Sequence, residues 1–354
     1  MAFAARPRPA GVPAALLLAV AALTGGAAVP AAACACGAVA GTGATATVNN
    51  EVALVHWDGA RQTILMQLAL RADGDRAALV VPTPAPATVS AGSPDTFTEL
   101  ERQTAPEIVT ERDFFGSGDF EGLSSGAAPG AAPTVLNQVT LGPLEATTLA
   151  GGGLDGVRNW LRDNGYRMRP EVVETLAPYL AEGWSLVAIR LTGADGLDGA
   201  LDPVRLTFDA TAPVYPMRMS SAATLPQSVR LYVLGEHRVR RADPDAAHQF
   251  TEVEFAGRLG EADDPLLREL TANGTDYLTE LAVSIPEPAR ISSDFTFADA
   301  DSDAEHRERI TRTEQVQVLG FPAGPVILGA ALLAATLVVI AVIRVFRGPR
   351  RSAS

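Results

Sequence analysis

The feature that most constrains this chain is an apolar stretch near its C-terminus, residues 321–343, which an arginine cluster follows at once. The stretch holds 23 residues and no charged side chain. As a helix it would be roughly 35 Å long at ~1.5 Å per residue, enough to cross ~30 Å of hydrocarbon with some tilt. Arginines next to an apolar segment mark its cytoplasmic side. We therefore predict a transmembrane helix over 319–343, with the lipid bilayer as its partner, and a cytoplasmic Arg-rich tail over 344–354.

The N-terminus carries the pattern of a secretory signal. Arg6 and Arg8 precede an uncharged, strongly apolar stretch, and the small residues at 31–33 offer a cleavage site. We predict a signal peptide over 1–33; an uncleaved anchor helix is the alternative. Under both interpretations the arginine pair stays in the cytoplasm and the following residues lie outside. The expected protein is a single-pass protein of the cell membrane, with an extracytoplasmic body over 34–318.

The charge of this body limits its partners. Residues 34–318 keep 22 of the 28 arginines and all 41 acids, a net charge of −19. Such a body repels nucleic acid and anionic lipid, so we expect no nucleic-acid partner. Solubility is the simplest role of the charge, and attraction of cations or basic partners is the functional alternative.

Periodicity predicts the elements of the body. Apolar and polar residues alternate at 51–57, and apolar stretches follow at 63–70 and 77–81. Turn residues such as Asp58-Gly59 separate them, which indicates a meander of three antiparallel strands. Further strands are expected at 135–141, 184–191, 204–208, 229–234 and 250–255. Helices are expected from Ser93 to just before Pro106, from Asp155 to Asn164, from Pro170 to Gly183, and as short pieces at 266–272 and 277–281. The predicted class is α+β, a mainly antiparallel β-sheet or sandwich with a few packed helices, plus the C-terminal transmembrane helix.

Three short stretches serve as motifs by which the body can be compared with known families. They are Trp160-Leu-Arg-Asp-Asn-Gly-Tyr166, Tyr179-Leu-Ala-Glu-Gly-Trp184 and Ile291-Ser-Ser-Asp-Phe-Thr-Phe297. With a cysteine directly after the signal, they make the body resemble bacterial domain-of-unknown-function family 2330. The resemblance implies a secreted or surface-anchored domain without an assigned activity, and it brings no catalytic residues. The first stretch also has a structural interpretation, in which Gly165 ends a helix in a left-handed conformation and Tyr166 anchors the exit.

Cys34 and Cys36 are the only cysteines. Outside the cell these thiols are expected to oxidise, although a disulfide two residues apart closes a small, strained ring. A bridge between them, a lipid on Cys34, and free or intermolecular thiols remain alternatives.

The motifs for catalysis and cofactors lack their structural context. Ser124 lies in a GxSxG pattern without the flanking strand and helix of a nucleophile elbow. Residues 151–156 fit GxGxxG outside any parallel βαβ unit. We assign no catalytic residue and no cofactor.

One acidic run is a weak calcium candidate. The oxygen donors of Asp299, Asp301, Asp303 and Glu305 alternate along the chain, and such donors suit Ca²⁺. The run lacks the glycine and the distal glutamate of an EF-hand loop, so a solvated acidic loop is the default. The four histidines show no metal-ligand spacing, and His56, on a predicted strand, is expected to be structural.

These observations favour a non-catalytic binding or structural module of the cell envelope, with an envelope protein or wall component as partner. The alternative is an extracytoplasmic hydrolase that uses paired carboxylates, for which two carboxylates ~5–9 Å apart in a cleft would be needed. A role in the assembly of a membrane complex, or as its sensor, is a third possibility.

Overall fold

The computed structural model describes residues 38–41, 46–72, 76–115, 138–139, 145–149, 153–166, 168–192 and 197–346. The predicted signal peptide, Cys34, Cys36, Ser124 and residues 347–354 lie outside the described residues.

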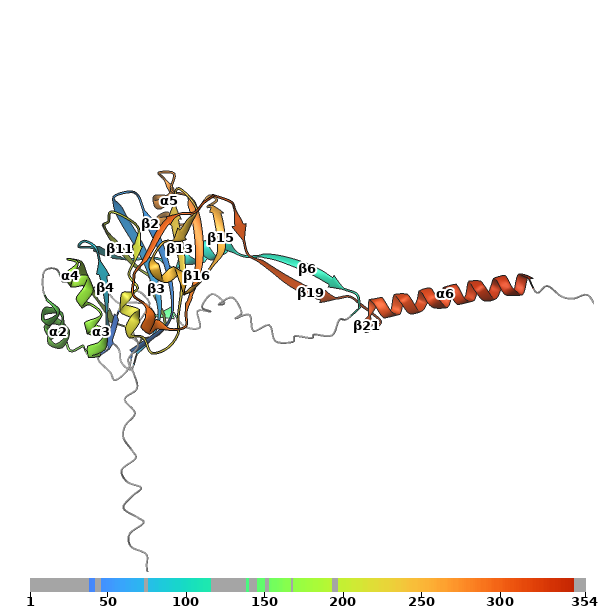
Figure 1. Cartoon of the computed structure of the whole chain (residues 1–354), viewed down its shortest axis with the longest axis horizontal. Helices are drawn as coiled ribbons and strands as arrows, with labels where there is room; N and C mark the ends of the chain where they lie inside the picture. Colours follow the sequence, from blue (N-terminus) through green and yellow to red (C-terminus); the bar gives the residue numbers. More distant parts are fainter. Residues whose placement is uncertain are drawn as a thin grey trace, which may run out of the picture. The chain divides into compact units, whose positions relative to one another are not determined.

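A large and a small β-sheet make up most of the body (Figure 1). The large sheet has the order β18 (His306–Arg307), β15 (Phe250–Arg258), β16 (Tyr277–Ile285), β13 (Gln227–Gly235), β2 (Ala46–Trp57), β3 (Arg61–Ala72), β10 (Leu197–Leu201) and β7 (Gln138–Val139), with β11 (Val204–Asp209) on β3 and β5 (Thr88–Ala91) on β11. The small sheet has the order β1 (Ala38–Gly41), β4 (Arg76–Thr83), β9 (Ser185–Thr192) and β8 (Glu145–Leu149). A three-stranded sheet of β12 (Val214–Tyr215), β17 (Phe295–Asp299) and β14 (Val239–Arg241) completes the body. Most pairs are antiparallel, but β2 and β13 run parallel.

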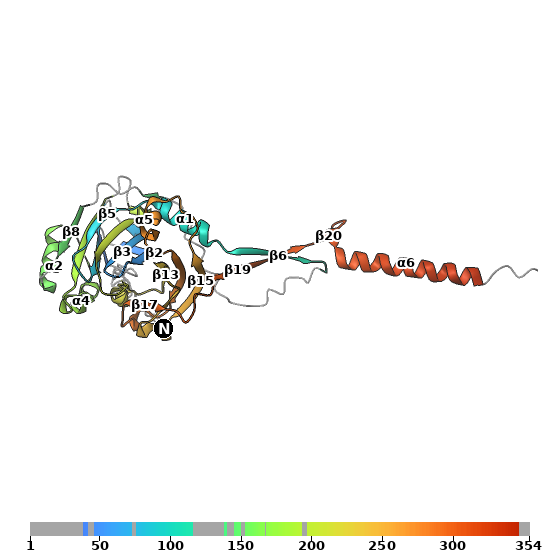
Figure 2. The same cartoon turned by 90° about the horizontal axis from the view of Figure 1, so that it is seen from above.

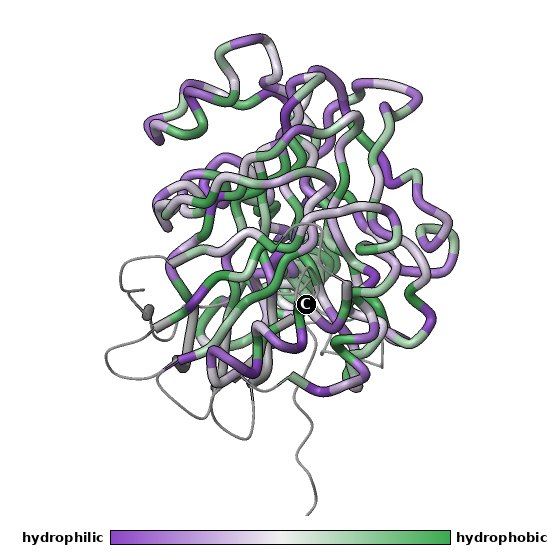
Figure 3. The backbone as a smooth tube through the Cα atoms, turned by 90° about the vertical axis from the view of Figure 1, so that its left-hand side faces the viewer, coloured by the Kyte–Doolittle hydropathy of each residue, from purple (hydrophilic) through white to green (hydrophobic). Residues whose placement is uncertain are grey.

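Alternation along the strands explains the layers. Side chains of a strand point to opposite faces in turn, and on β4 Leu79 and Val81 enter the core between the two sheets, whereas Ala78 and Val80 enter a second core. Helices α2 (Leu154–Asp163), α3 (Pro170–Glu174) and α4 (Ala177–Ala181) cover that second core. Helices α1 (Pro94–Thr104) and α5 (Pro265–Thr271) cover the outer face of the large sheet (Figure 2). In Figure 3 the hydrophobic segments, green, accordingly lie mostly in the interior of the body.

The predicted class, α+β with mainly antiparallel sheet, is confirmed. The predicted turn at Asp58 and the predicted helix cap at Ser93 are also confirmed. Asp58 forms the turn between β2 and β3, and its Oδ1 accepts a hydrogen bond from the N–H of Arg61 at 2.7 Å. Ser93 caps α1, its Oγ accepting from the N–H of Asp95 at 3.1 Å. Helix α2, in contrast, has Gly153 as its N-cap, and Asp155 lies in its first turn. There the carboxylate still interacts favourably with the positive end of the helix dipole.

The single helix predicted from Pro170 to Gly183 is divided into α3 and α4. Two predictions of strand pairing or element type are wrong. The strand predicted at 77–81 exists as β4, but it pairs with β1 and β9 in the small sheet and so does not complete a meander with β3. The helical piece predicted at 277–281 is the beginning of β16. Its apolar spacing suggested a helix, but Leu278 and Leu281 enter different cores on opposite faces, because β13 and β15 pair with both edges of β16.

A two-stranded ribbon leads to the C-terminal helix. Strand β6 (Glu107–Asp113) pairs in parallel with β19 (Arg309–Gln315). A hairpin of β20 (Gln317–Val318) and β21 (Phe321–Pro322) follows, then α6 (Ala323–Phe346). Over 22 residues, Ala323–Arg344, α6 is long and apolar enough to cross a membrane. Ala323 and Gly324 at its beginning are buried, and the rest of the span is exposed or half-buried. The helix thus begins four residues later than position 319, because residues 319–322 belong to the hairpin.

Candidate functional site

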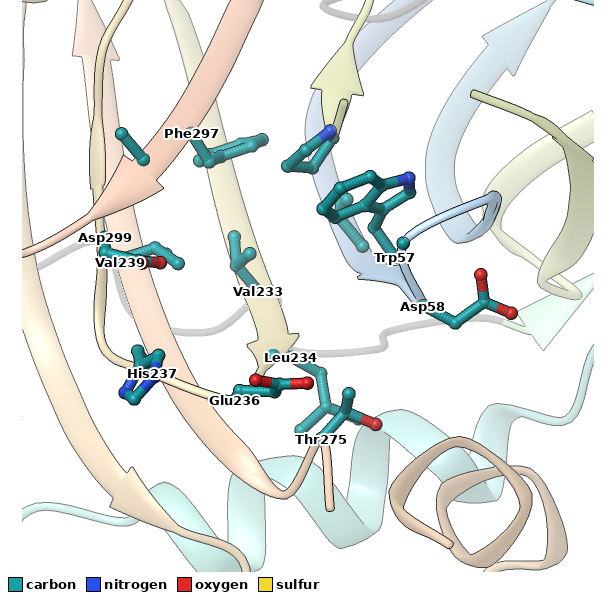
Figure 4. A pocket seen from close by; sticks show the side chains of 15 residues that line it. Trp57, Asp58, Val233, Leu234, Glu236, His237, Val239, Thr275, Phe297 and Asp299 are labelled. Atoms are coloured by element: carbon teal, nitrogen blue, oxygen red, sulfur yellow. The ribbon is translucent and has the colours of Figure 1, made fainter. Parts of the chain in front are cut away.

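The described residues form a pocket of about 290 Å³ where the parallel strands β2 and β13 end (Figure 4). Because the two strands run in the same direction, Trp57 at the end of β2 and Glu236 just after β13 come to one edge of the sheet. Strand β17 contributes Phe297 and Asp299 from the opposite side. The complete lining is Val55, Trp57, Asp58, Gly59, Pro213, Val233, Leu234, Gly235, Glu236, His237, Val239, Thr275, Phe297, Ala298 and Asp299.

Hydrogen bonds hold the walls of the pocket in place. The indole Nε1–H of Trp57 donates to the Ala210 carbonyl at 2.9 Å. Thr275 donates to the Leu270 carbonyl at 2.6 Å, and its Oγ1 lies 3.0 Å from Nε2 of the buried His56. Burial lowers the pKa of His56, which favours its neutral form. His56 is therefore a structural residue behind the pocket, as predicted.

The rim of the pocket is acidic. It carries the carboxylates of Asp58, Glu236 and Asp299, and among the described residues that line it there is no arginine. Backbone N–H groups of Arg61 and Ala60 lower the pKa of Asp58, so this carboxylate is ionised at neutral pH. Figure 4 shows the rings of Trp57 and Phe297 on one side of the pocket and Glu236 and His237 on the other. Negative charge above an apolar, aromatic wall suits an organic cation.

The structure divides the predicted calcium run. Asp299 lines the pocket, whereas the Asp303 carboxylate accepts from His237 Nδ1 at 2.8 Å and from the Arg238 N–H at 2.9 Å. This bond to Asp303 raises the pKa of His237. Asp301 and Glu305 are exposed. No group of three or more His, Cys, Asp or Glu side chains among the described residues is arranged to hold a metal ion.

Sequence reasoning missed Trp57, Glu236 and Asp58 as members of one site. Asp58 and Glu236 each follow a strand whose pattern is apolar, and polar residues directly after strands are a usable signal. Their proximity, however, depends on the parallel pairing of β2 with β13, for which the sequence carries no local sign.

Residues of the stretches 179–184 and 291–297 both contact Arg218. The contact from the second stretch comes from Asp294, just before β17. The guanidinium group lies 4.1 Å from the ring centroid of Tyr179, and its Nε donates to Asp294 Oδ2 at 2.8 Å. It also forms an ion pair with Glu182. Asp294 in turn accepts from the Tyr179 hydroxyl and from the N–H groups of Met217, at 2.7 Å, and Arg218, at 3.0 Å. This network ties α4 to the segment before β17.

The stretch 160–166 is structural as well. Gly165 has φ +78° directly after α2, a left-handed conformation that glycine adopts without steric cost. Tyr166 is buried, stacks on Trp160 with 6.1 Å between the ring centroids, and accepts from Arg190 Nε at 3.1 Å. These contacts confirm the predicted helix end.

A pair of carboxylates lies within the large sheet. Arg230 Nη1 contacts Glu254 Oε2 at 3.0 Å and Glu280 Oε1 at 2.5 Å. Both glutamates are buried. Burial, followed by the neighbouring Glu280 carboxylate, raises the pKa of Glu254 to about 7, while Arg230 opposes the rise. Neither glutamate lines the pocket at the end of β2 and β13.

Comparisons with known proteins give one extensive match. The profile of the family described as "Uncharacterized protein conserved in bacteria (DUF2330)" matches residues 30–298. No curated protein matches the chain. Among solved structures, the crystal structure of baculovirus P35 is similar over 72% of this chain and 98% of that chain, with 6% identity and a TM-score of 0.35. A mutated baculovirus P35 after caspase cleavage is similar over 70% and 99%, with 6% identity and a TM-score of 0.32. Scores this low carry no conclusion about function.

Proposed function

Because the chain belongs to the DUF2330 family of uncharacterised bacterial proteins, we propose a function from its pocket and its terminal helix. The protein is a membrane-anchored, extracytoplasmic binding module of the cell envelope. Its pocket takes an organic cation, an ammonium or guanidinium group carried on an apolar body.

The observation that carries this proposal is the combination of an acidic rim with an aromatic wall. Carboxylates of Asp58 and Glu236 attract a positive group, and the Trp57 ring, fixed by its bond to Ala210, offers a surface for cation–π contact. At about 290 Å³ the pocket is at the lower end of ligand-site sizes, which suits one side chain or a small amine. The net charge of −19 over 34–318 would also speed the approach of a basic partner.

The anchor supports the envelope location. Helix α6 has the length and apolarity of a membrane span, and Arg344 with the arginines behind it favours a cytoplasmic C-terminus. The signal-like N-terminus and the acidic charge of 34–318 agree with export of the body.

The alternative, a hydrolase with paired carboxylates, finds less support. Glu254 and Glu280 are enclosed by the sheet and share Arg230, whereas glycoside hydrolysis needs a pair that flanks the substrate. We interpret these two glutamates as part of a structural cluster.

Ligand-observed NMR on the full chain in lipid nanodiscs tests the proposal, with phenethylammonium as the probe and phenylacetate as its anionic counterpart. We expect saturation transfer to the cation alone. Glu236→Gln should weaken binding about fivefold, since a partly exposed ion pair contributes up to ~1 kcal/mol. Asp301→Asn is the matched control, because Asp301 is exposed, lies two residues from the rim residue Asp299 and does not line the pocket.

Equal binding of the anion, or unchanged binding by Glu236→Gln, would contradict the proposed ligand class. Release of soluble fragments from purified cell-wall polymer by the full chain would contradict the non-catalytic role.

A further inference from the structure

The ribbon of β6 and β19 leads to the beginning of α6 (Figures 1 and 2). Exposed apolar side chains gather in the segments that meet there. They come from the end of β6 and from the β20–β21 hairpin. Leu319 is 90% exposed and Phe321 is 66% exposed. We call this set the collar; it consists of Phe114, Phe115, Val318, Leu319 and Phe321.

Backbone hydrogen bonds hold the two parts of the collar together, although about 200 residues separate them in the chain. The Val316 N–H donates to the Asp113 carbonyl at 2.8 Å, and the Gly324 N–H donates to the Phe114 carbonyl. Phe115 lies against the first turn of α6, where a Cβ on Gly324 would come within 2.6 Å of its ring. The end of β6 is therefore docked on the beginning of the apolar helix.

The turn of the hairpin points to an apolar environment. Leu319 and Gly320 are its two central residues, with φ +55° and +81°. A two-residue turn of this kind favours Asn-Gly, because a bulky residue at positive φ is strained. Here a leucine bears that strain and also exposes nearly its whole side chain. Strain of this kind is tolerated where the residue has another role, and contact with lipid is a role that leucine can fill.

Length places the collar at the membrane surface. Helix α6 is apolar over 22 residues, Ala323–Arg344, which is roughly 33 Å at ~1.5 Å per residue and already covers the ~30 Å of hydrocarbon. Residues just before Ala323 therefore fall in the interfacial layer, on the side away from Arg344. Phenylalanine and leucine are typical of the apolar face by which a segment lies in that layer.

The ribbon needs support at both ends. A two-stranded sheet is marginally stable in water by itself, and the residues of β19 are exposed throughout. At the body, the Glu107 N–H donates to the Glu308 carbonyl at 2.8 Å, and Arg307 Nη2 donates to the Gln103 carbonyl at 3.0 Å. At the other end only the collar and α6 are available among the described residues.

We propose that the collar inserts into the outer interfacial layer of the bilayer and seats the β6–β19 ribbon on the membrane. This inference rests on the proposed anchoring by α6. The occupant of the collar surface is lipid, and α6 continues the same apolar surface into the hydrocarbon.

Depth-dependent fluorescence quenching tests the inference in the full chain. The chain carries Cys34→Ser and Cys36→Ser, and it is reconstituted in vesicles of phosphatidylcholine and phosphatidylglycerol. Single cysteines introduced by Leu319→Cys or Phe115→Cys carry an environment-sensitive dye, and Thr311→Cys on β19 is the control. We expect lipid-borne nitroxide to quench the dye at 319 and at 115, and aqueous iodide to quench it much less than it quenches the dye at 311. The dye at 311 should show the reverse.

Iodide quenching at 319 and 115 equal to that at 311 would overturn the inference. So would shielding from both quenchers that increases with the protein-to-lipid ratio, because this identifies a second copy as the occupant. Flotation of the chain with the vesicles after alkaline carbonate treatment is scored separately. If the chain fails to float, the proposed anchor is wrong and the collar with it; if it floats while the dye stays in water, the collar alone is wrong.

Discussion

Replacing Asp294 by asparagine should destabilise the body strongly, because this carboxylate holds several donors at once. Its Oδ1 accepts from the Tyr179 hydroxyl and from the N–H groups of Met217 and Arg218, and its Oδ2 accepts from Arg218 Nε at 2.8 Å. Burial and the Asp294 charge raise the pKa of Tyr179, so the tyrosine remains a donor. In Asp294→Asn the amide oxygen can replace only one of the two carboxylate oxygens, so the NH2 group would face either Arg218 Nε or the three donors at Oδ1.

The size of the effect follows from burial. Removing one partner of a buried ion pair costs about 3–5 kcal/mol. Arg218 keeps Glu182 as a partner, so we expect the lower end, about 3 kcal/mol. The matched control is Glu182→Gln, since Glu182 pairs with the same arginine but its side chain is 47% exposed. An exposed pair contributes at most about 1 kcal/mol.

Equilibrium urea unfolding of the full chain in detergent micelles measures both variants through tryptophan fluorescence. Trp184 lies 5.0 Å from Tyr179 between ring centroids and reports on this region. With a slope of about 3 kcal/mol per molar urea, Asp294→Asn should lower the midpoint by about 1 M. A loss of stability below that of Glu182→Gln, or no loss, would refute the reasoning that Asp294 organises the network.

Two further predictions concern stability and pH. The folded pKa of Glu254, about 7, lies above the unfolded value of 4.5, so the folded state binds the proton more tightly. The stability that this shift contributes should therefore be fully present below about pH 4.5 and be lost as the pH rises through about 7. Glu254→Gln should flatten this part of a stability-against-pH curve, and an unchanged slope would contradict the assignment. Gly165→Ala should cost about 1 kcal/mol, because φ is +78° there. Gly156→Ala, inside α2 and facing open space, should instead stabilise by about 0.5–1 kcal/mol, and thermal unfolding should show opposite signs for the pair.

Of the candidate site, the sequence alone identified only fragments. The sequence distinguishes Asp299 by its place in an acidic run and His56 by its place on a predicted strand. The structure puts Asp299 on the pocket rim and His56 behind the wall. Nothing in the sequence distinguishes Glu236, because a single glutamate after a strand is common. Glu236 is a candidate ligand-binding residue because it lines the same pocket as Trp57, at the ends of β13 and β2. The two residues are about 180 positions apart in the chain.

Features that depend on neighbours along the chain could be determined from the sequence. The apolar run that becomes α6, the Asp58 turn, the Ser93 cap and the Gly165 helix end each depend on residues within a few positions. Pairing over long distances could not be determined in this way. The strand β16, the place of β4 in the small sheet, the parallel contact of β2 with β13 and the docking of Phe115 on Gly324 exist only because distant segments bury apolar surface and share backbone hydrogen bonds. The energy of those contacts exceeds local preference, and only the folded chain decides which segments meet.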